Sequence, residues 1–296
     1  MRQLHWFQTD LRLEDNPALS SAQDADSLLC IYLMPKPRPW CNLTGLGPQR
    51  DRFLRESLRG LKEQLQTLGQ DLMVLEGSPE LVLPNIVDRF SIDRVTTSYT
   101  PGWYETQAIA FLEQKLPATL SVFRGSTLFD TEQFHFEMED LPDTFSPFRR
   151  KVEKMNIRSP MATPSTLPPP PSAQFDAIPR AAASPHPGLP LPGGSAAGLR
   201  RLDQFLFHTH AIADYKQTRN ALDGLSGSST LSPWLATGAL SVRTVAHAIF
   251  RYEREHVAND STYWLYFELL WREFFHWRAV IDGQSLFRQG GRSGRR

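Results

Sequence analysis

Several features of exported, membrane and metal-binding proteins are missing from this sequence. No apolar run reaches membrane-spanning length, and the N-terminal stretch MRQLHWFQTDLRLED carries charge where a signal peptide needs an apolar core. The chain has two cysteines, Cys30 and Cys41, which form no recognisable disulfide or metal framework and are typical of a reducing compartment. We therefore expect a globular protein of the cytoplasm without a bound metal.

Two further absences restrict the function. Thirty-two basic residues balance 32 acidic ones, so the overall charge favours no polyanionic partner, and a nucleic-acid face would have to be a local patch. The pattern G-x-G-x-x-G and the phosphate-loop pattern do not occur, so ordinary dinucleotide or nucleoside-triphosphate chemistry has no support. With 296 residues, the chain is long enough for two domains that each bury a core.

The first 125 residues alternate short apolar runs with helical patterns. Between two of the runs, leucines at 54, 58, 61, 65 and 68 form one helical stripe that ends at Gly69. Alternation of this kind predicts a doubly wound α/β fold with a parallel sheet. The predicted strands are Leu4–Phe7, Leu28–Leu33, Asp71–Leu75, Arg94–Thr97 and Leu120–Phe123.

Ligands of such sheets bind at the carboxyl ends of the strands. The loop TDLRLEDNPAL follows the first strand there, and its Asp15-Asn16-Pro17 is a good helix start. This loop and the one around Tyr104 and Glu105 are therefore the expected lip of a site.

A proline-rich stretch divides the chain. Eleven of its 23 prolines fall between Pro160 and Pro192, a composition that should form an extended, semi-rigid connection without a core of its own. We expect an α/β domain over residues 1–155, a linker over 156–195 and an all-α domain over 196–296.

The segment STYWLYFELLWREFFHWRAV, residues 261–280, predicts a helix that begins at a cap on Asp260 or Ser261. Both of its faces are apolar, which is typical of a helix inside a larger helical domain. Glu268 interrupts the aromatic residues four positions before Arg272. It either forms an i,i+4 ion pair with that arginine or is retained for a functional site, and both interpretations stay open.

The stretch DGLSGSSTLSPWLATGALS, residues 223–241, concentrates small hydrogen-bonding residues just before a helical pattern. Free N–H and hydroxyl groups in such a place suit a phosphate, although Ser and Gly are also ordinary loop residues. Spacing alone does not decide between the two.

Longer motifs resemble the photolyase and cryptochrome family. YKQTRNALDGLSGSSTLSPWLATGALS and NDSTYWLYFELLWREFFHW are similar to its flavin-binding half, and the second is most similar to DASH-type cryptochromes. LHWFQTDLRLEDNPAL resembles the family's opening strand and loop, and GSTLFDTEQFHFEMEDLPDTFSPFRRKVEK resembles the segment that leaves its α/β domain. These motifs occur in the family's order over most of residues 1–287.

The resemblance implies a light-driven flavoprotein with an α/β antenna domain and an all-α FAD-binding domain. In members that repair DNA, photoexcited reduced FAD passes an electron to a cyclobutane pyrimidine dimer flipped out of the strand. DASH-type members resemble repair enzymes that prefer single-stranded DNA, and photoreception is also associated with them. The implied partner is DNA that contains pyrimidine dimers, with no membrane, and the implied state of a complete chain is a monomer.

The resemblance also assigns cofactor residues. Tyr215 matches the tyrosine at the flavin phosphate end, and Arg272 matches an arginine near the flavin. Tyr104 and Glu105 fall where the family holds its folate antenna, 5,10-methenyltetrahydrofolate, although a plain helix-start glutamate fits as well. The residues that match the phosphate-and-ribityl loop are Ser228, Ser229, Thr230, Leu231 and Ser232.

On the DNA side, the matching positions are Arg219, Glu268 and Trp271, and the charge of Arg272 also suits DNA. An extruded base pair needs an aromatic shelf and a carboxyl partner, and Trp271 and Glu268 lie one helical turn apart. We therefore take Glu268 and Trp271 as the candidate catalytic residues.

The sequence also departs from the family pattern. Gln8 replaces an arginine of the opening motif, and Thr230 replaces a basic residue of the phosphate loop. After DGQSLF the family continues with contacts to the flavin ring, whereas this chain has only RQGGRSGRR, whose four arginines suit either a nucleic-acid tail or a short solvated end. Whether the chain is an enzyme therefore stays open. The alternative is a non-catalytic remnant that acts as a folate- or nucleotide-binding module.

Overall fold

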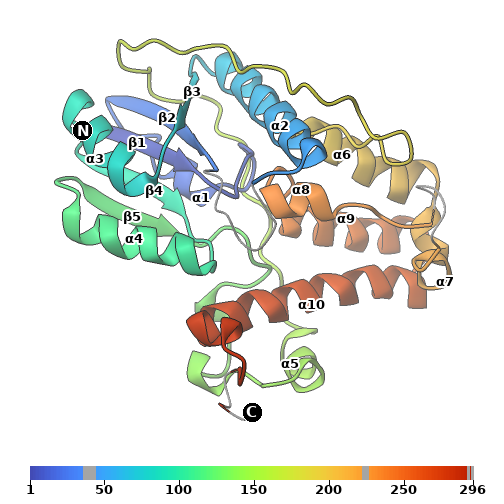
Figure 1. Cartoon of the computed structure of the whole chain (residues 1–296). Helices are drawn as coiled ribbons and strands as arrows, with labels where there is room; N and C mark the ends of the chain where they lie inside the picture. The colour runs from blue at the N-terminus through green and yellow to red at the C-terminus, as the bar shows by residue number, and fades with distance from the viewer. Residues whose placement is uncertain (36–44, 222–226, 292–293, 295–296) are drawn as a thin grey trace.

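The computed structural model describes residues 1–35, 45–221, 227–291 and 294. Its first part is a five-stranded sheet in which every pair of neighbouring strands is parallel, in the order β3-β2-β1-β4-β5 (Figure 1). The predicted doubly wound α/β fold is confirmed, and each predicted strand is found within two residues of its expected bounds. The strands are β1 Arg2–Phe7, β2 Ser27–Met34, β3 Leu72–Glu76, β4 Arg94–Ser98 and β5 Thr119–Phe123.

Helices cover both faces of the sheet, so its apolar residues form two separate cores. Helices α1 (Pro17–Ser20) and α2 (Pro48–Thr67) pack on one face, and α3 (Pro79–Phe90) and α4 (Trp103–Lys115) pack on the other. The leucine stripe of α2 is buried as its periodicity predicts. Asn16 caps α1 because its side chain accepts a hydrogen bond from Leu19 N at 3.0 Å.

The second part of the chain is helical, as predicted, and it extends the core on the α2 face of the sheet. The longest helix, α10 (Asp260–Asp282), crosses the molecule below α6, α8 and α9 and above α5 in the view of Figure 1. Its N-cap is Asn259, so the expected caps Asp260 and Ser261 were wrong by one and two residues. The other α-helices are α5 Phe145–Val152, α6 Ser195–Asp203, α7 Tyr215–Thr218, α8 Ser232–Thr237 and α9 Val242–Glu255. One π-helix, η3 Gln204–His208, and four 3-10 helices complete the described elements: η1 Thr131–Gln133, η2 Met138–Asp140, η4 Ala211–Asp214 and η5 Gly283–Phe287.

The proline-rich stretch runs over the α/β part without a helix or a strand of its own. The expectation that it buries no core was too strict, because Leu167, Ile178 and Leu191 are buried against the body of the protein. Its backbone also joins the sheet region, since the Pro169 carbonyl accepts a hydrogen bond from Leu28 N at 3.0 Å. The segment is therefore a packed strap, while the exact domain boundaries stay a prediction.

Directional polar contacts hold the helical part against the loop that follows β1. The buried Asp15 carboxylate accepts a hydrogen bond from Arg243 Nε at 2.9 Å and pairs with the Ser241 hydroxyl. Arg12 donates to the Gly238 carbonyl at 2.9 Å. Gly238 has a φ of +67°, and a Cβ there would overlap the Thr9 carbonyl, so only glycine fits this junction.

No helix among the described residues combines the length and the apolar character needed to cross a membrane. Cys30 is buried, and Cys41 lies outside the described residues. The same holds for Arg292, Arg295 and Arg296 of the C-terminal stretch, whereas its Arg288 is described and donates to Gln284 Oε1 at 3.2 Å.

Candidate functional site

Three of the predicted site residues meet between α7 and α10. The Tyr215 hydroxyl donates to Glu268 Oε2 at 2.6 Å, and Arg219 Nη1 donates to Glu268 Oε1 at 3.2 Å. Burial and the bond to Glu268 raise the pKa of Tyr215 well above its ordinary value, so the phenol stays protonated and donates this bond. The geometry orients the Glu268 carboxylate with two donors from a segment some fifty residues earlier.

Glu268 therefore does not form the i,i+4 ion pair that its spacing from Arg272 allows. Arg272 instead donates to the Ser126 carbonyl at 2.7 Å and lies beside Glu273. Burial lowers the pKa of Arg272 from its ordinary value. The interpretation of Glu268 and Arg272 as an ion pair is therefore wrong. Glu268 is bonded to Tyr215 and Arg219, and Arg272 makes its contacts elsewhere.

The predicted phosphate loop lies next to this cluster. A hydrogen bond from the loop residue Ser229 lowers the pKa of Tyr215, against the larger effects of burial and Glu268. Within the loop, Leu231 is buried, Ser228 is half-buried and Ser232 is exposed at the first turn of α8. Gly224 and Ser226, at the start of the same stretch, lie outside the described residues.

Arg201 holds this loop in place from α6. Its guanidinium donates to the Ser228 carbonyl at 2.7 Å, to the Ser229 carbonyl at 3.0 Å and to the Thr230 hydroxyl at 3.0 Å. Thr230 adopts a left-handed backbone with a φ of +54°. Sequence analysis missed Arg201, and no local signal marks it, because its role depends on contacts with residues 27 to 29 positions away.

Two buried nitrogen atoms beside the cluster have no hydrogen-bond partner among the described residues. They are Arg219 Nε and the indole Nε1 of Trp264. The Arg219 guanidinium also lies 4.9 Å from the centre of the Trp264 ring. Because buried donors are normally paired, these two can each still donate a hydrogen bond to water or to a ligand.

Trp271 lies three residues after Glu268 on α10 and is 36% exposed. Its ring stacks on Phe145 with a centroid distance of 3.7 Å and an interplanar angle of 14°. Phe275 lies near it at 5.5 Å. One face of the indole is therefore already covered by Phe145.

Glu273 is a second buried carboxylate on α10 that sequence analysis missed. It accepts hydrogen bonds from Leu128 N at 2.8 Å, Phe129 N at 3.3 Å and Trp277 Nε1 at 2.7 Å. Burial raises its pKa above the ordinary value, against these bonds. The argument that singled out Glu268, a charge within an aromatic helix, applies equally to Glu273 and would have found it.

Tyr104 and Glu105 line a separate cavity of about 570 Å³ at the carboxyl ends of β1, β2 and β3. Thr9 and Leu11, from the loop after β1, line the same cavity, as the strand-end rule predicts. The Tyr104 side chain is 58% exposed. A Cβ on Gly102, the N-cap of α4, would overlap the Glu105 carboxylate, so Glu105 also folds back over its own helix start.

Comparisons with known proteins agree with this architecture. The sequence model of the DNA photolyase family matches residues 3–171. Cryptochrome DASH of Idiomarina loihiensis is 37% identical over 298 residues, which cover 98% of this chain and 66% of that protein. The crystal structure of a cryptochrome from Synechocystis sp. matches with a TM-score of 0.92 at 35% identity, covering 100% of this chain and 65% of that one. An archaeal photolyase from Sulfolobus tokodaii, whose crystal structure holds two FAD molecules, shares the fold with a TM-score of 0.69 at 22% identity, covering 97% of this chain and 61% of that one.

A parallel α/β domain followed by a helical part with these motifs defines the photolyase and cryptochrome class. The chain belongs to the DNA photolyase family. Within that family it is similar to the cryptochromes DASH. It spans less than two thirds of the length of these relatives.

Proposed function

We propose that this chain forms part of a light-dependent flavoprotein that binds FAD and repairs cyclobutane pyrimidine dimers in single-stranded DNA. The observation that carries the proposal is the cluster of Tyr215, Ser229, Arg219 and Glu268, which joins the predicted flavin loop to the predicted DNA residues. Blue-light reception is the second use of the same flavin site that the family resemblance suggests.

The residues of this region fit the phosphate and ribityl part of FAD. Ser228 and Ser232 carry hydroxyl groups on a loop that Arg201 holds in place, and Tyr215 is hydrogen-bonded to Ser229 of the same loop. The unpartnered donors Arg219 Nε and Trp264 Nε1 would find acceptors on a bound polar ligand. When bound and reduced, the flavin supplies the photoexcited electron that opens a pyrimidine dimer.

The proposed role of Glu268 is to accept a hydrogen bond from a pyrimidine base. Each of its two oxygens already accepts one bond, from Tyr215 or from Arg219, and a carboxylate has about four lone-pair sites. A base N–H can therefore bind without breaking either contact. The two existing donors also fix the carboxylate, so that little ordering is needed when a base arrives.

Trp271 is proposed as the stacking shelf for that base. Since Phe145 covers one face of the indole, a base can stack only on the opposite face or by displacing Phe145. A base–aromatic stack contributes about 1–3 kcal/mol, comparable to an aromatic pair within the protein, so either arrangement is energetically accessible.

The test compares FAD stoichiometry with the affinity for dimer-containing single strands. Trp271→Ala should weaken strand binding by about 1–3 kcal/mol and leave the FAD content unchanged. Glu268→Ala should slow repair per photon more than it weakens binding, because its hydrogen bond strengthens as the dimer gains charge. Ser232→Arg, which obstructs the loop, should abolish FAD binding.

Phe111→Ala is the control, because it removes an exposed aromatic ring of α4, which belongs to neither proposed site. It should change neither quantity. Equal loss of FAD and strand affinity in Trp271→Ala would instead mean that the tryptophan only packs, and would end the proposal for that residue.

The cavity at Tyr104 and Glu105 favours a second binding function. We propose that it takes the antenna folate, 5,10-methenyltetrahydrofolate, since its volume of about 570 Å³ and its place at the strand ends suit a small aromatic ligand. If the chain has no repair activity, this cavity would still allow the protein to act as a folate- or nucleotide-binding module. Glu105→Gln should lower the folate retained after purification, measured by near-ultraviolet absorbance, without lowering FAD content, and unchanged folate would refute the assignment.

A further inference from the structure

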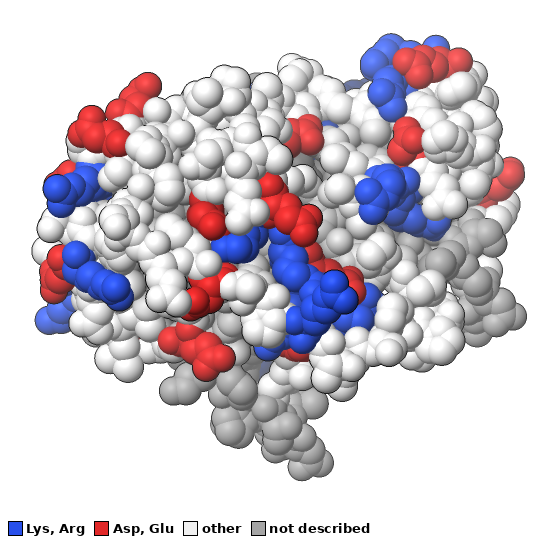
Figure 2. All heavy atoms as spheres, turned by 90° about the horizontal axis from the view of Figure 1, so that it is seen from above, with Lys and Arg blue, Asp and Glu red and all other residues white. Residues whose placement is uncertain are grey.

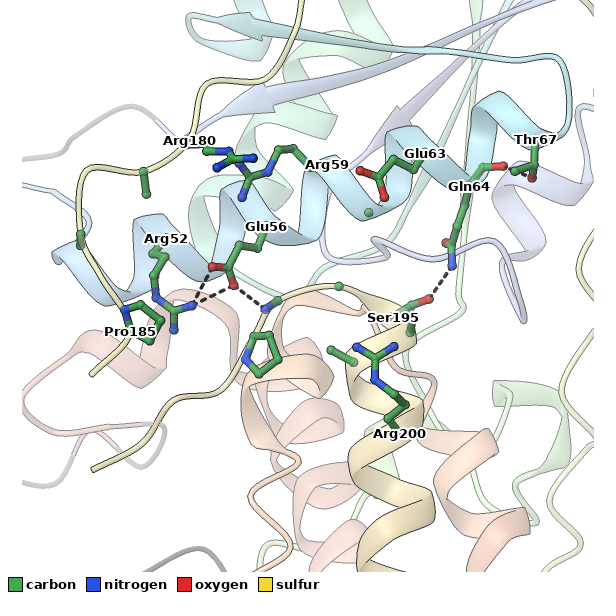
Figure 3. A pocket seen from close by; sticks show the side chains of 18 residues that line it. Arg52, Glu56, Arg59, Glu63, Gln64, Thr67, Arg180, Pro185, Ser195 and Arg200 are labelled. Atoms are coloured by element: carbon green, nitrogen blue, oxygen red, sulfur yellow. Dashed lines mark hydrogen bonds and ion pairs between the residues drawn. The ribbon is translucent and has the colours of Figure 1, made fainter. Parts of the chain in front are cut away.

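A larger cavity, of about 770 Å³, lies away from both sites described above. It is an open pocket between α2, residues 180–185 of the strap and the beginning of α6, and its Arg180 and Arg200 are exposed (Figure 3). None of the residues of the Tyr215 and Glu268 cluster lines it. The adjacent residues Arg200 and Arg201 belong to different regions. Arg200 lines this cavity, whereas Arg201 donates a hydrogen bond to the loop at Ser228.

One wall of the cavity is already fully hydrogen-bonded. Arg52 Nη1 donates to both oxygens of Glu56, at 2.7 and 2.9 Å, and Arg52 Nη2 donates to the Leu191 carbonyl at 2.8 Å. Glu56 also accepts from Gly193 N at 2.7 Å (Figure 3). These contacts tie the strap to α2 and leave little capacity for a ligand.

Three other arginines of the cavity have no such partners. The side chains of Arg59, Arg180 and Arg200 make no hydrogen bond or ion pair with any residue that the structure describes, and Arg59 and Arg180 point their guanidinium groups toward one another (Figure 3). Arg180 and Arg200 are exposed and Arg59 is half-buried, so water screens part of their mutual repulsion, and an anion bound between them would relieve the rest. With Glu63 as the remaining carboxylate, the lining carries two positive charges in excess.

The beginning of α6 adds to this potential. Its N-cap, Gly194, offers no side chain to the first turn, and no acidic residue occurs there. Ser195 and Ala196, at the positive end of the helix, line the cavity, and the Glu56 carboxylate, which accepts from Gly193 N just before the N-cap, offsets only part of this potential.

The surrounding surface is not uniformly basic. Figure 2, which views the molecule from above Figure 1, shows Lys and Arg side chains gathered near the centre of this face with Asp and Glu side chains beside them. A long polyanion would meet these acidic groups, whereas a compact ligand within the cavity would meet mainly the three arginines. The volume lies within the range of small-molecule sites.

We infer that this cavity binds a nucleotide-sized ligand with at least two phosphate groups, held by Arg59, Arg180 and Arg200. Arginine suits phosphate because its planar fork donates two parallel hydrogen bonds. Glu63 is placed to accept a hydrogen bond from a hydroxyl or amino group of the same ligand.

Titration calorimetry of the 296-residue protein with ATP and with pyrophosphate, without magnesium, tests the inference. Both should bind with one site, and Arg59→Gln or Arg200→Gln should each weaken binding about tenfold, the loss expected for one charged hydrogen bond. Arg254→Gln, which removes an exposed arginine of α9, is the matched control and should bind like the unmodified protein. Ser232→Arg should also leave this binding unchanged, which separates it from the proposed flavin site.

A further variant separates loss of the site from loss of the fold. Ala196→Glu places a carboxylate in the first turn of α6, where it favours the helix but opposes a phosphate. It should abolish ATP and pyrophosphate binding while the melting temperature stays the same or rises. The inference is overturned if the unmodified protein binds neither probe at millimolar concentration, or if the Arg59, Arg200 and Arg254 variants bind equally well. Loss of single-strand binding in the Arg59 and Arg200 variants, without any nucleotide binding, would instead identify the cavity as a nucleic-acid contact and would also overturn it.

Discussion

Replacing Glu273 by alanine should destabilise the junction between the sheet domain and α10. The carboxylate is fully buried and accepts hydrogen bonds from Leu128 N, Phe129 N and Trp277 Nε1. The substitution leaves these three buried donors unpaired and opens a small cavity. An unsatisfied buried donor costs about 1–3 kcal/mol, and partial relaxation makes the three less than additive, so we expect a loss of about 3–5 kcal/mol.

Glu273→Gln separates hydrogen bonding from charge. Because burial raises the pKa of Glu273 in the folded protein, its ionisation opposes folding. Its contribution to stability is therefore fully present below the unfolded-state pKa of about 4.3 and is lost as the pH rises through the folded-state pKa. The stability advantage of the unmodified protein over Glu273→Gln should accordingly be larger in acid than at neutral pH.

Thermal and urea unfolding followed by tryptophan fluorescence measures both effects, and hydrogen exchange over residues 260–282 locates them. Glu113→Ala, at an exposed position of α4, is the control and should change stability by less than about 0.5 kcal/mol. If Glu273→Ala lowers the free energy of unfolding by less than about 1 kcal/mol, the three hydrogen bonds of Glu273 do not stabilise the fold as argued. If the stability advantage of the unmodified protein over Glu273→Gln instead grows with pH, the argument that ionisation of Glu273 opposes folding is refuted.

Three further outcomes follow from the packing. Gly238→Ala should lower the free energy of unfolding by about 2–4 kcal/mol, because the alanine would be strained in the left-handed region and would overlap the loop after β1. Gly69→Ala, at a φ of +73° with open space around it, should cost only the backbone strain of about 1–2 kcal/mol. Equal losses in the two variants would contradict this explanation. A fragment of residues 1–180 should melt at a higher temperature than residues 1–155, because the longer one keeps the buried Leu167 and Ile178 of the strap, and coincident melting curves would show that these two residues contribute nothing. Phe275 is 61% exposed beside other aromatic rings of α10, so Phe275→Ser should lower self-association in sedimentation velocity, and an unchanged distribution would exclude this face as the cause.

Elements governed by local rules could be predicted from the sequence. The strands have a continuous apolar pattern because both faces of a parallel sheet are covered, and α2 has a 3.6-residue stripe because only one of its faces is. Asn16 could be predicted as the start of α1 because capping and the following proline act within a few residues. The cap of α10 was misplaced because Asn259, Asp260 and Ser261 are all good capping residues, and the backbone at Asn259 decides among them.

The strap was misjudged for a related reason. Proline-rich composition predicts an extended chain, but it carries no information about which surface that chain lies on. Leu167, Ile178 and Leu191 are buried because the α/β domain offers them an apolar surface, a fact that belongs to the folded protein.

The sequence determined which residues belong to the site, and the tertiary structure determined which of them are hydrogen-bonded to one another. The motifs were sufficient to single out Tyr215, Arg219 and Glu268, yet spacing favoured a pair between Glu268 and Arg272. Side chains four residues apart on a helix are always near neighbours, but the half-buried Glu268 carboxylate binds the donors that the surrounding elements bring to it. Here α7 delivers Tyr215 and Arg219 to Glu268, and α6 delivers Arg201 to the loop at Ser229. These contacts join residues between 28 and 53 positions apart, a separation at which no periodicity or propensity operates and only packing decides.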